Sequence, residues 1–353
     1  MLSLIAGAEE EILVTSFLLN DGPETRPVLE ALAKKSAAGV KVHIIGDGSS
    51  RYVKEPEAFE FLSSSGVSWA EFHPVKGWRL FVPRSVFERD HRKYWVVDGK
   101  TVFLGGANLS DGSLLDPENG GNRDLMVKLE SSEAAGRLRQ AFMRTWNESV
   151  SRDRLEESPS GEGIDSAVGD SLKFWFFDQD ETRSRESMTG VMLDGLFASA
   201  KKSVWLVQPY TFTNAEILSG IEGMTRRGVE VNVVLSTQVR APRFHYASYY
   251  GIRDLLEAGA RVWIFDSAIS PLHYKCALVD DRLAYVGSAN LNYRSFYLSR
   301  ELNVVFDDPA CVREVKKVVD SVRAECREVG MEEAVRYRSL PFATWWLIMQ
   351  TAG

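Results

Sequence analysis

Cysteine is scarce in this 353-residue sequence, which contains only Cys276, Cys311 and Cys326. They form no CxxC pair and no Cys/His spacing of the kind that binds zinc. This argues against a disulfide-stapled secreted fold and indicates free thiols, buried or partly buried, in a reducing compartment. The sequence also lacks a clustered Asp/Glu/His motif, so we expect neither a bound metal nor another cofactor.

Long apolar runs are missing as well. No window reaches the ~18 consecutive apolar residues that a membrane-spanning helix needs. The N-terminal stretch MLSLIAGAEEEILV lacks a basic region and becomes charged by Glu9, unlike a signal peptide. We therefore expect a cytoplasmic protein. The sequence leaves open whether Met1 is the natural start or whether further residues, including a membrane segment, precede it.

An excess of positive charge is also absent. The 42 Lys and Arg residues against 49 Asp and Glu residues give a formal net charge of -7. Proteins that bind nucleic acid without sequence preference usually present a basic surface, so nucleic acid is a disfavoured partner. The 44% hydrophobic and 26% charged residues are typical of a soluble protein with a sizeable core, and the length allows two domains.

A repeated block is the strongest positive signal. Five residues recur 182 positions later in the chain: His91, Lys93, Asp98, Gly105 and Asn108 return as His273, Lys275, Asp280, Gly287 and Asn290. Flanking segments recur too, AEEEILVTSF as AKKSVWLVQPY and RDLMVKLE as RELNVVFD, with offsets that drift by a few residues. The sequence therefore predicts two copies of one architecture.

The composition between the two copies predicts the domain limits. Residues 148–171 are polar and rich in Ser, Gly and acidic residues, which indicates a surface linker. We expect a first domain at 1–147, a second at 172–330 and an apolar tail at 331–353.

In each half, apolar strands alternate with helices that end at Gly39 or Gly228. This predicts an α/β fold with a mostly parallel sheet covered by helices. The stretch YASYYGIRDLLEAG predicts one further helix in the second half, and Asp98-Gly99 predicts a hairpin turn.

The polar residues of the repeated block suggest chemistry on a phosphodiester. On a strand, residues i and i+2 point to the same side, so each His and the Lys two residues later share a face. Lys93 and Lys275 would neutralise non-bridging oxygens, and Asn108 and Asn290 would donate amide hydrogens to them. One neutral imidazole would attack phosphorus while the other, protonated, gives its proton to the leaving alkoxide, without a metal.

The pattern H-x-K-x4-D followed by G-(G/S)-x-N, present twice, resembles the phospholipase D superfamily from the first helix to about Asp308. HRKYWVVDGKTVFLGGANLSD and LHYKCALVDDRLAYVGSANLNYRSFYLSRELNVVF resemble bacterial cardiolipin synthases most. The resemblance implies two similar α-β-α sandwich halves related by a pseudo-twofold axis, with the active site at their interface. It also implies a ping-pong reaction through a phosphohistidine, and no second subunit is required for the site.

The resemblance also implies roles for polar residues of the two halves. His91 is the expected nucleophile and His273 the expected general acid/base, although the sequence itself is symmetric on this point. Glu301 is expected to orient His91 through Nδ1, and Asp124 to orient His273. Ser288, beside Asn290, is assigned to phosphate binding together with the lysines and asparagines, whereas Asp98 and Asp280 are interpreted as structural.

The resemblance predicts a phosphatidyltransferase that converts phosphatidylglycerol to cardiolipin. The alternatives are a hydrolytic phospholipase D that releases phosphatidic acid and a nuclease on the same scaffold. Two departures bear on the acceptor. Synthases of this group commonly carry two membrane-spanning helices before the first domain, which this sequence does not show, and SDGSLLDPENGGN is an inserted-looking loop after Asn108 at the rim of the site.

The C-terminal stretch YRSLPFATWWLIMQTAG is the most apolar part of the chain. It has two interpretations, which the sequence leaves open. One is a final helix packed on the body of the protein. The other is an interfacial anchor, because paired Trp residues favour the headgroup region of a bilayer. A phospholipid substrate favours such a peripheral membrane contact.

Overall fold

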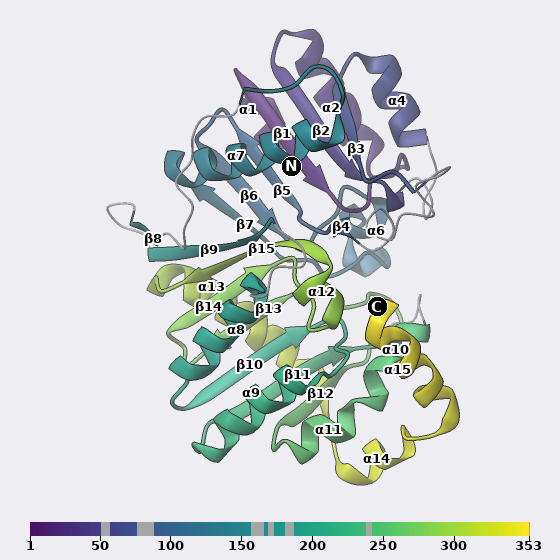
Figure 1. Ribbon diagram of the computed structural model, residues 1–353, viewed down its shortest axis with the longest axis vertical. Coiled ribbons are helices and arrows are strands. Elements are labelled where there is room, and N and C mark those ends of the chain that lie inside the picture. The colour runs from purple at the N-terminus through teal and green to yellow at the C-terminus, as the bar shows by residue number, and fades with distance from the viewer. Residues whose placement is uncertain are drawn as a thin grey trace.

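Two β-sheets, one from each half of the chain, lie one above the other in the computed structural model (Figure 1). The structure describes residues 1–50, 57–75, 88–156, 166–168, 173–180, 187–237 and 242–352. Helices cover both faces of each sheet, which confirms the predicted pair of α-β-α halves.

The first sheet has the strand order β3-β2-β1-β5-β6-β7. Its strands are β1 (Glu11–Ser16), β2 (Lys41–Asp47), β3 (Ser68–Phe72), β5 (Tyr94–Val97), β6 (Thr101–Gly105) and β7 (Met126–Glu130). β1, β2 and β3 are parallel, but β5 is antiparallel to β1, and β6 and β7 continue antiparallel. The prediction of a mostly parallel sheet is therefore wrong, because the short turn between β5 and β6 can join only antiparallel strands.

The second sheet repeats this order at its centre and extends it on both sides, as β16-β12-β11-β10-β13-β14-β15-β9-β8. Its strands are β8 (Ser166–Val168), β9 (Lys173–Gln179), β10 (Ser203–Gln208), β11 (Glu230–Ser236), β12 (Arg261–Phe265), β13 (Cys276–Val279), β14 (Leu283–Gly287), β15 (Ser299–Phe306) and β16 (Cys326–Val329). β4 (Arg89–Asp90), from the first half, pairs with β15 of the second. The two halves therefore share backbone hydrogen bonds next to His91.

The helices of the first half are α1 (Leu2–Gly7), α2 (Arg26–Ala37), α4 (Glu57–Ser65), α6 (Asp111–Leu114), the 3-10 turn η2 (Pro117–Asn119) and α7 (Ser132–Ser149). Those of the second half are α8 (Met188–Ser199), α9 (Ala215–Arg226), α10 (Pro242–Tyr250), α11 (Ile252–Glu257), α12 (Tyr293–Tyr297), α13 (Pro309–Ala324), α14 (Met331–Arg336) and α15 (Leu340–Ala352).

One hydrophobic core runs through both halves. Leu138 and Phe142 of α7 belong to the same buried cluster as Val315 and Val319 of α13. The outer faces of the two sheets have separate cores, under α2 and α4 in the first half and under α8, α9 and α11 in the second. Because α7 and α13 share one core, the interface between the halves is held by apolar burial as well as by β4.

Asp98 and Asp280 occupy equivalent turns, and both have a positive φ, of 50° and 53°. The Asp98 carboxylate accepts hydrogen bonds from the backbone amides of residues 9, 10 and 11. Asp280 accepts from those of residues 201, 202 and 203. Each aspartate thus joins its hairpin to the start of the neighbouring strand, at the far end of that strand from the histidines.

The region between the halves departs from the predicted linker in two ways. α7 continues to Ser149, and the three residues of β8 pair with β9. Residues 157–165 and 169–172 of the predicted linker lie outside the described residues, so its limits stay a prediction. The three cysteines are unpaired, with Cys276 buried and the others partly buried, as predicted.

The helix predicted over YASYYGIRDLLEAG is broken in two at Gly251, between α10 and α11. A Cβ at Gly251 would lie 2.8 Å from Thr213 Oγ1, so the chain bends where it passes close to Thr213. Sequence periodicity does not reveal such a tertiary contact.

The C-terminal helix α15 packs on α10, with Trp346 5.2 Å from Tyr250 between ring centroids and Met349 buried against Phe212. Leu347 and Ile348 on the same helix remain 69% and 44% exposed. One side of α15 therefore packs on the body of the protein, and the helix also exposes apolar side chains to solvent. Within the described ranges, no helix is long and apolar enough to span a bilayer.

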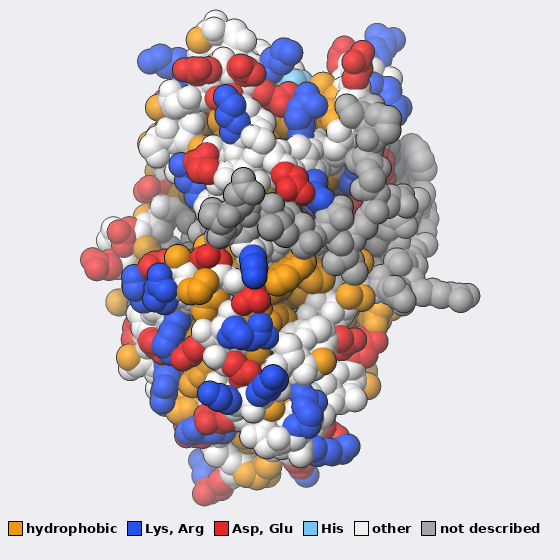
Figure 2. Space-filling view, turned by 90° about the vertical axis from the view of Figure 1, so that its left-hand side faces the viewer, with side chains coloured by type: hydrophobic (Ala, Val, Ile, Leu, Met, Phe, Trp, Pro, Cys, Tyr) orange, Lys and Arg blue, Asp and Glu red, His pale blue; other side chains and the backbone are white. Residues whose placement is uncertain are grey.

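Figure 2 shows the face of the molecule on the β8–β9 side. Basic and acidic side chains are interspersed over both halves, and an apolar area of the second half borders the grey residues. No continuous basic stripe of the kind that follows a nucleic-acid backbone is visible among the described residues on this face.

Candidate active site

The backbones around the two repeated histidines cross between the halves. His91 N donates to Arg300 O at 3.0 Å, and His273 N donates to Arg123 O at 2.9 Å. In each case the accepting arginine immediately precedes a carboxylate residue of the other half, Glu301 or Asp124. The same backbone hydrogen bond therefore joins the two halves twice, once from the histidine of the first half to the second half and once from the histidine of the second half to the first.

Each histidine contacts the carboxylate that the resemblance assigned to it. His91 Nδ1 lies 3.0 Å from Glu301 Oε1, and His273 Nδ1 lies 2.6 Å from Asp124 Oδ1. Because a carboxylate accepts hydrogen bonds, Nδ1 carries the proton in both rings. The other ring nitrogen, Nε2, is then left with its lone pair for chemistry.

The His-x-Lys segments are not strands, which differs from the prediction. Residues 91–93 and 273–275 are extended links that lead into β5 and β13. Each link leads from the contact with the other half of the protein into the sheet of its own half. The shared face of His and Lys therefore results from tertiary contacts as well as from the extended backbone.

Burial and the contacts with neighbouring charges together set the charge states of the two imidazole–carboxylate pairs. Burial lowers the pKa of His91 to about 4, although Glu301 opposes this shift. Burial also lowers the pKa of His273, against the effect of Asp124. Burial alone would raise the pKa of Glu301, but the contacts with His91 and Lys93 lower it below its usual range. At neutral pH His91 is therefore a neutral imidazole held by an ionised carboxylate.

The two motif lysines are almost fully buried, with exposures of 1%. Lys275 Nζ donates to His273 O at 2.8 Å, and Lys93 Nζ makes the equivalent bond to His91 O. Burial lowers the pKa of Lys93 to about 7 and that of Lys275 to about 8. An arriving anion would compensate this burial and restore the full charge of both ammonium groups.

The motif asparagines differ in their contacts. Asn108 Oδ1 accepts from Leu18 N at 3.0 Å, whereas Asn290 Nδ2 donates to Tyr210 Oη at 3.0 Å. Both asparagines are 4% exposed. Tyr210 is a site residue that the sequence reasoning did not identify, although it follows its strand at the position where Leu18 follows β1.

Ser288 is assigned to phosphate binding by the sequence analysis, and its contacts in the structure are with Glu301 and Leu302. It is fully buried, and its Oγ donates to Glu301 Oε2 and accepts from Leu302 N. Ser288 therefore holds the carboxylate that orients His91. The corresponding residue of the first half is Gly106, where a Cβ would lie 2.9 Å from Asp124 Oδ1.

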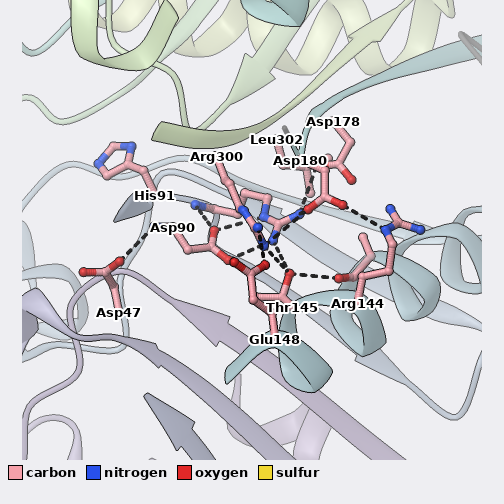
Figure 3. Close-up of polar contacts among 12 residues, drawn as sticks. Asp47, Asp90, His91, Arg144, Thr145, Glu148, Asp178, Asp180, Arg300 and Leu302 are labelled. Atoms are coloured by element: carbon pink, nitrogen blue, oxygen red, sulfur yellow. Dashed lines mark hydrogen bonds and ion pairs between the residues drawn. The ribbon is translucent and has the colours of Figure 1, made fainter. Parts of the chain in front are cut away.

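An ionic network surrounds the backbone of His91 (Figure 3). Arg92 is fully buried and bonds Asp90, Asp178 and Asp180. Figure 3 also shows Arg300 directed toward Thr145 and Glu148 of α7, to which its guanidinium donates. The residues on both sides of His91 are thus fixed by the ion pairs of Arg92 with Asp90, Asp178 and Asp180 and by its hydrogen bond to the Thr145 hydroxyl of α7. The sequence did not predict these contacts.

Phe17 is a second contact that the sequence reasoning missed. Its ring meets the His91 ring edge-on with 4.8 Å between centroids, and Lys93 Nζ lies 5.2 Å from the Phe17 centroid. The ring therefore excludes water from one side of His91 and Lys93.

The loop SDGSLLDPENGGN forms one wall of a cavity of about 540 Å³ beside Asp124. Asp111 ties the loop to the first half by accepting from the backbone amides of Glu24 and Thr25. Across the described ranges, no group of three or more His, Cys, Asp or Glu side chains could hold a metal ion.

The fold of the whole chain matches that of a solved phosphatidylserine synthase from Haemophilus influenzae. The TM-score is 0.79 at 15% sequence identity, and the match covers 99% of this chain and 92% of that one. At this identity the match shows a shared fold and nothing finer. It confirms the fold of two similar halves that the sequence predicted.

The family profile described as "Cardiolipin synthase, PLD-like domain" matches residues 1–146 and 193–323, and the chain belongs to this family. The cardiolipin synthase of Halalkalibacterium halodurans is 28% identical over 297 residues, covering 84% of this chain and 58% of that protein. The major cardiolipin synthase ClsA of Bacillus subtilis is 27% identical over 332 residues, covering 92% and 66%. The chain thus spans about three fifths of the length of these relatives.

Proposed function

We propose that this protein is a phosphatidyltransferase that acts on phospholipid phosphodiesters through a phosphohistidine, and that it forms cardiolipin from phosphatidylglycerol. One observation carries the proposal: two imidazoles, each held at Nδ1 by a carboxylate of the other half, meet beside two buried lysines. The family of the chain supports the lipid substrate, because its relatives are named cardiolipin synthases.

In the first step His91 is the nucleophile. Its Nε2 lone pair forms the N–P bond, and the bond from phosphorus to the oxygen of the headgroup glycerol breaks. That oxygen leaves with the bonding electrons and takes the Nε2 proton of the His273 imidazolium. A bound phosphodiester anion favours this protonated state of His273, and Lys93 and Lys275 stabilise the charge on the non-bridging oxygens.

In the second step the hydroxyl of a second phosphatidylglycerol attacks phosphorus. Its proton passes to Nε2 of His273, now neutral, and the N–P bond breaks with its electron pair returning to His91. Asp124 and Glu301 keep Nδ1 protonated in both rings, so both reactions occur at Nε2. Water in place of the second lipid would give phosphatidic acid, so the outcome depends on the acceptor.

The decisive experiment incubates the purified chain with phosphatidylglycerol vesicles and follows the lipids by mass spectrometry. Cardiolipin with released glycerol is expected. Phosphatidic acid alone would make the protein a hydrolase. Absence of lipid turnover together with cleavage of single-stranded DNA would overturn the lipid substrate. With radiolabelled phosphatidylglycerol, His91→Ala is expected to abolish covalent labelling and His273→Ala to let labelled protein accumulate slowly. The reverse pattern would exchange the roles of the histidines.

We also propose that α15 brings the site to the membrane as a peripheral contact. Leu340, Leu347 and Ile348 are exposed by 79%, 69% and 44%, while Trp345 and Met349 on the same helix pack in one aromatic cluster with Tyr210. Tyr210 in turn contacts Asn290. The exposed apolar side chains therefore lie on a helix that touches the site, where a lipid headgroup has to arrive.

Sedimentation with phosphatidylglycerol vesicles tests this contact. The double variant Leu347→Ser/Ile348→Ser is expected to weaken vesicle binding at least tenfold, because burying each side chain contributes ~1.5–3 kcal/mol. The control is Val335→Ser, which removes a 51% exposed apolar side chain from α14. Equal binding by both variants would contradict the role of α15.

A further inference from the structure

The segments that follow β1 and β10 pass the two motif asparagines in equivalent ways. Leu19 forms an isolated bridge with Leu109, and Thr211 forms one with Leu291. These bridges place position 18 beside Asn108 and position 210 beside Asn290. The first half has Leu at this position and the second has Tyr, so a phenol hydroxyl enters the site from one half alone.

The Asn108 carboxamide is consequently held through its oxygen and the Asn290 carboxamide through its nitrogen. Asn108 offers its oxygen to Leu18 N, and no described residue takes the hydrogens of its Nδ2. Asn290 instead offers Nδ2 to Tyr210 Oη, and its Oδ1 is buried with no hydrogen-bond partner among the described residues. A buried carbonyl oxygen without a donor costs about 1–3 kcal/mol.

The chemistry of the pair allows a better arrangement. A phenol hydroxyl can accept or donate, and a carboxamide turned by 180° exchanges its acceptor and donor ends. With the amide turned, Asn290 Oδ1 would accept the Tyr210 hydroxyl hydrogen, and Nδ2 would take the buried position that Oδ1 occupies now. Asn290 would then match Asn108, with its oxygen held by the protein and its NH2 group free to donate.

We infer that Tyr210 is a positioning residue that turns the Asn290 carboxamide when a phosphate group binds, so that Asn290 Nδ2 donates to a non-bridging oxygen. The inference deepens the proposed function and rests on it for the identity of the ligand. Tyr210 does not itself touch the phosphate. It supplies in the second half what a backbone amide supplies in the first.

The surroundings of Tyr210 suit this task. Its ring stacks on Phe212 with 5.0 Å between centroids and tilts against Phe244 at 4.9 Å, so its position does not depend on the hydroxyl. Burial raises the pKa of Tyr210, and the hydroxyl therefore keeps its proton at neutral pH. Removal of the hydroxyl alone should leave the aromatic cluster intact.

Calorimetric titration with inorganic phosphate at pH 7 tests the inference without lipid turnover. Tyr210→Phe is expected to weaken phosphate binding about tenfold, as the loss of one directed hydrogen bond to an anion would. Asn290→Ala is expected to weaken phosphate binding by a similar factor. The double variant Tyr210→Phe/Asn290→Ala is expected to bind phosphate no more weakly than Asn290→Ala alone. Tyr210→Phe combined with Asn108→Ala, by contrast, is expected to multiply the two losses, because these residues belong to different halves.

The matched control is Tyr249→Phe. Tyr249 is a 2% exposed tyrosine of α10 whose hydroxyl has no hydrogen-bond partner among the described residues. Its loss is expected to leave phosphate binding unchanged. The inference would be overturned if Tyr210→Phe bound phosphate as tightly as the wild-type protein, or if the losses of Tyr210→Phe and Asn290→Ala multiplied in the double variant. It would also be overturned if the wild-type protein bound no phosphate. Cardiolipin formation by the wild-type protein reports separately on the proposed function, so the two failures are distinguishable.

Discussion

Ser288 donates its hydroxyl hydrogen to Glu301 across 2.5 Å, and it is itself fully buried. The corresponding residue of the first half is Gly106, which has no side chain to offer Asp124. The carboxylate behind His91 is therefore held by a hydroxyl of the motif itself, whereas the hydroxyl near Asp124 is that of Ser113, outside the repeated residues. The repeat is symmetric in its histidines, lysines and asparagines but not in the groups that support them.

Ser288→Ala is expected to reduce the rate of lipid turnover about tenfold and the free energy of unfolding by about 1–2 kcal/mol. The substitution removes a donor from Glu301 and an acceptor from Leu302 N, and both groups remain buried. Initial rates and denaturant unfolding measure the two effects. Ser199→Ala, which removes a hydroxyl from the end of α8, is the control. A wild-type rate in Ser288→Ala would show that Glu301 needs no support.

Gly106→Ala is expected to lower activity at least tenfold. Its Cβ would lie 2.9 Å from Asp124 Oδ1, so the carboxylate must move away from His273 Nδ1. The control is Gly136→Ala on α7, where a Cβ meets nothing within 4 Å. That change is expected to stabilise the protein by roughly 0.5–1 kcal/mol through helix propensity, without altering the rate. Undiminished activity in Gly106→Ala would contradict the tight packing of Asp124.

The sequence predicts the parts of the fold that repeat. His91, Lys93 and Asn108 recur with constant spacing, so their meeting with His273, Lys275 and Asn290 could be anticipated. The crosswise partners Glu301 and Asp124 came from the family resemblance, because no spacing along one strand reveals a contact between halves. The direction of β5 was within reach too, since the Asp98 turn requires it to be antiparallel to β6.

The contacts that support the two histidine–carboxylate pairs could not be predicted. Ser288 lies in the motif, yet only the packing of β14 against β15 shows that its hydroxyl bonds Glu301. Arg92 follows His91 directly, and a charged residue there would usually be interpreted as exposed. Its burial depends on Asp178 of β9 and on Asp180, which directly follows β9.

Arg92→Met is expected to lower the free energy of unfolding by about 3–5 kcal/mol, because it leaves Asp90, Asp178 and Asp180 near one another without their shared cation. Denaturant unfolding measures the loss. Arg144→Met is the control, since Arg144 bonds Asp180 from a side chain that is 41% exposed and is expected to contribute about 1 kcal/mol or less. Equal losses in the two variants would contradict a special role for the buried guanidinium.

Anion binding at the site is expected to weaken as the pH rises from about 6.5 to 9. The pKa values of Lys93 and Lys275, about 7 and about 8, fall within this range. A bound anion favours the protonated amines, so binding takes up protons, and affinity must fall wherever the free protein loses them. The dissociation constant of sulfate is expected to rise by up to about tenfold per pH unit for each lysine that titrates.

Sulfate suits this measurement because its own charge is constant over the range, and calorimetry at fixed ionic strength gives the affinity. Lys93→Met is expected to weaken binding at pH 6.5 and to flatten the profile near pH 7, leaving the fall above pH 8 that Lys275 causes. Lys100→Met, which removes an exposed lysine from the β5–β6 turn, is expected to leave the profile unchanged. A flat wild-type profile would contradict the lowered pKa values of the two lysines, because ammonium groups that stay protonated throughout would bind sulfate equally at every pH in the range.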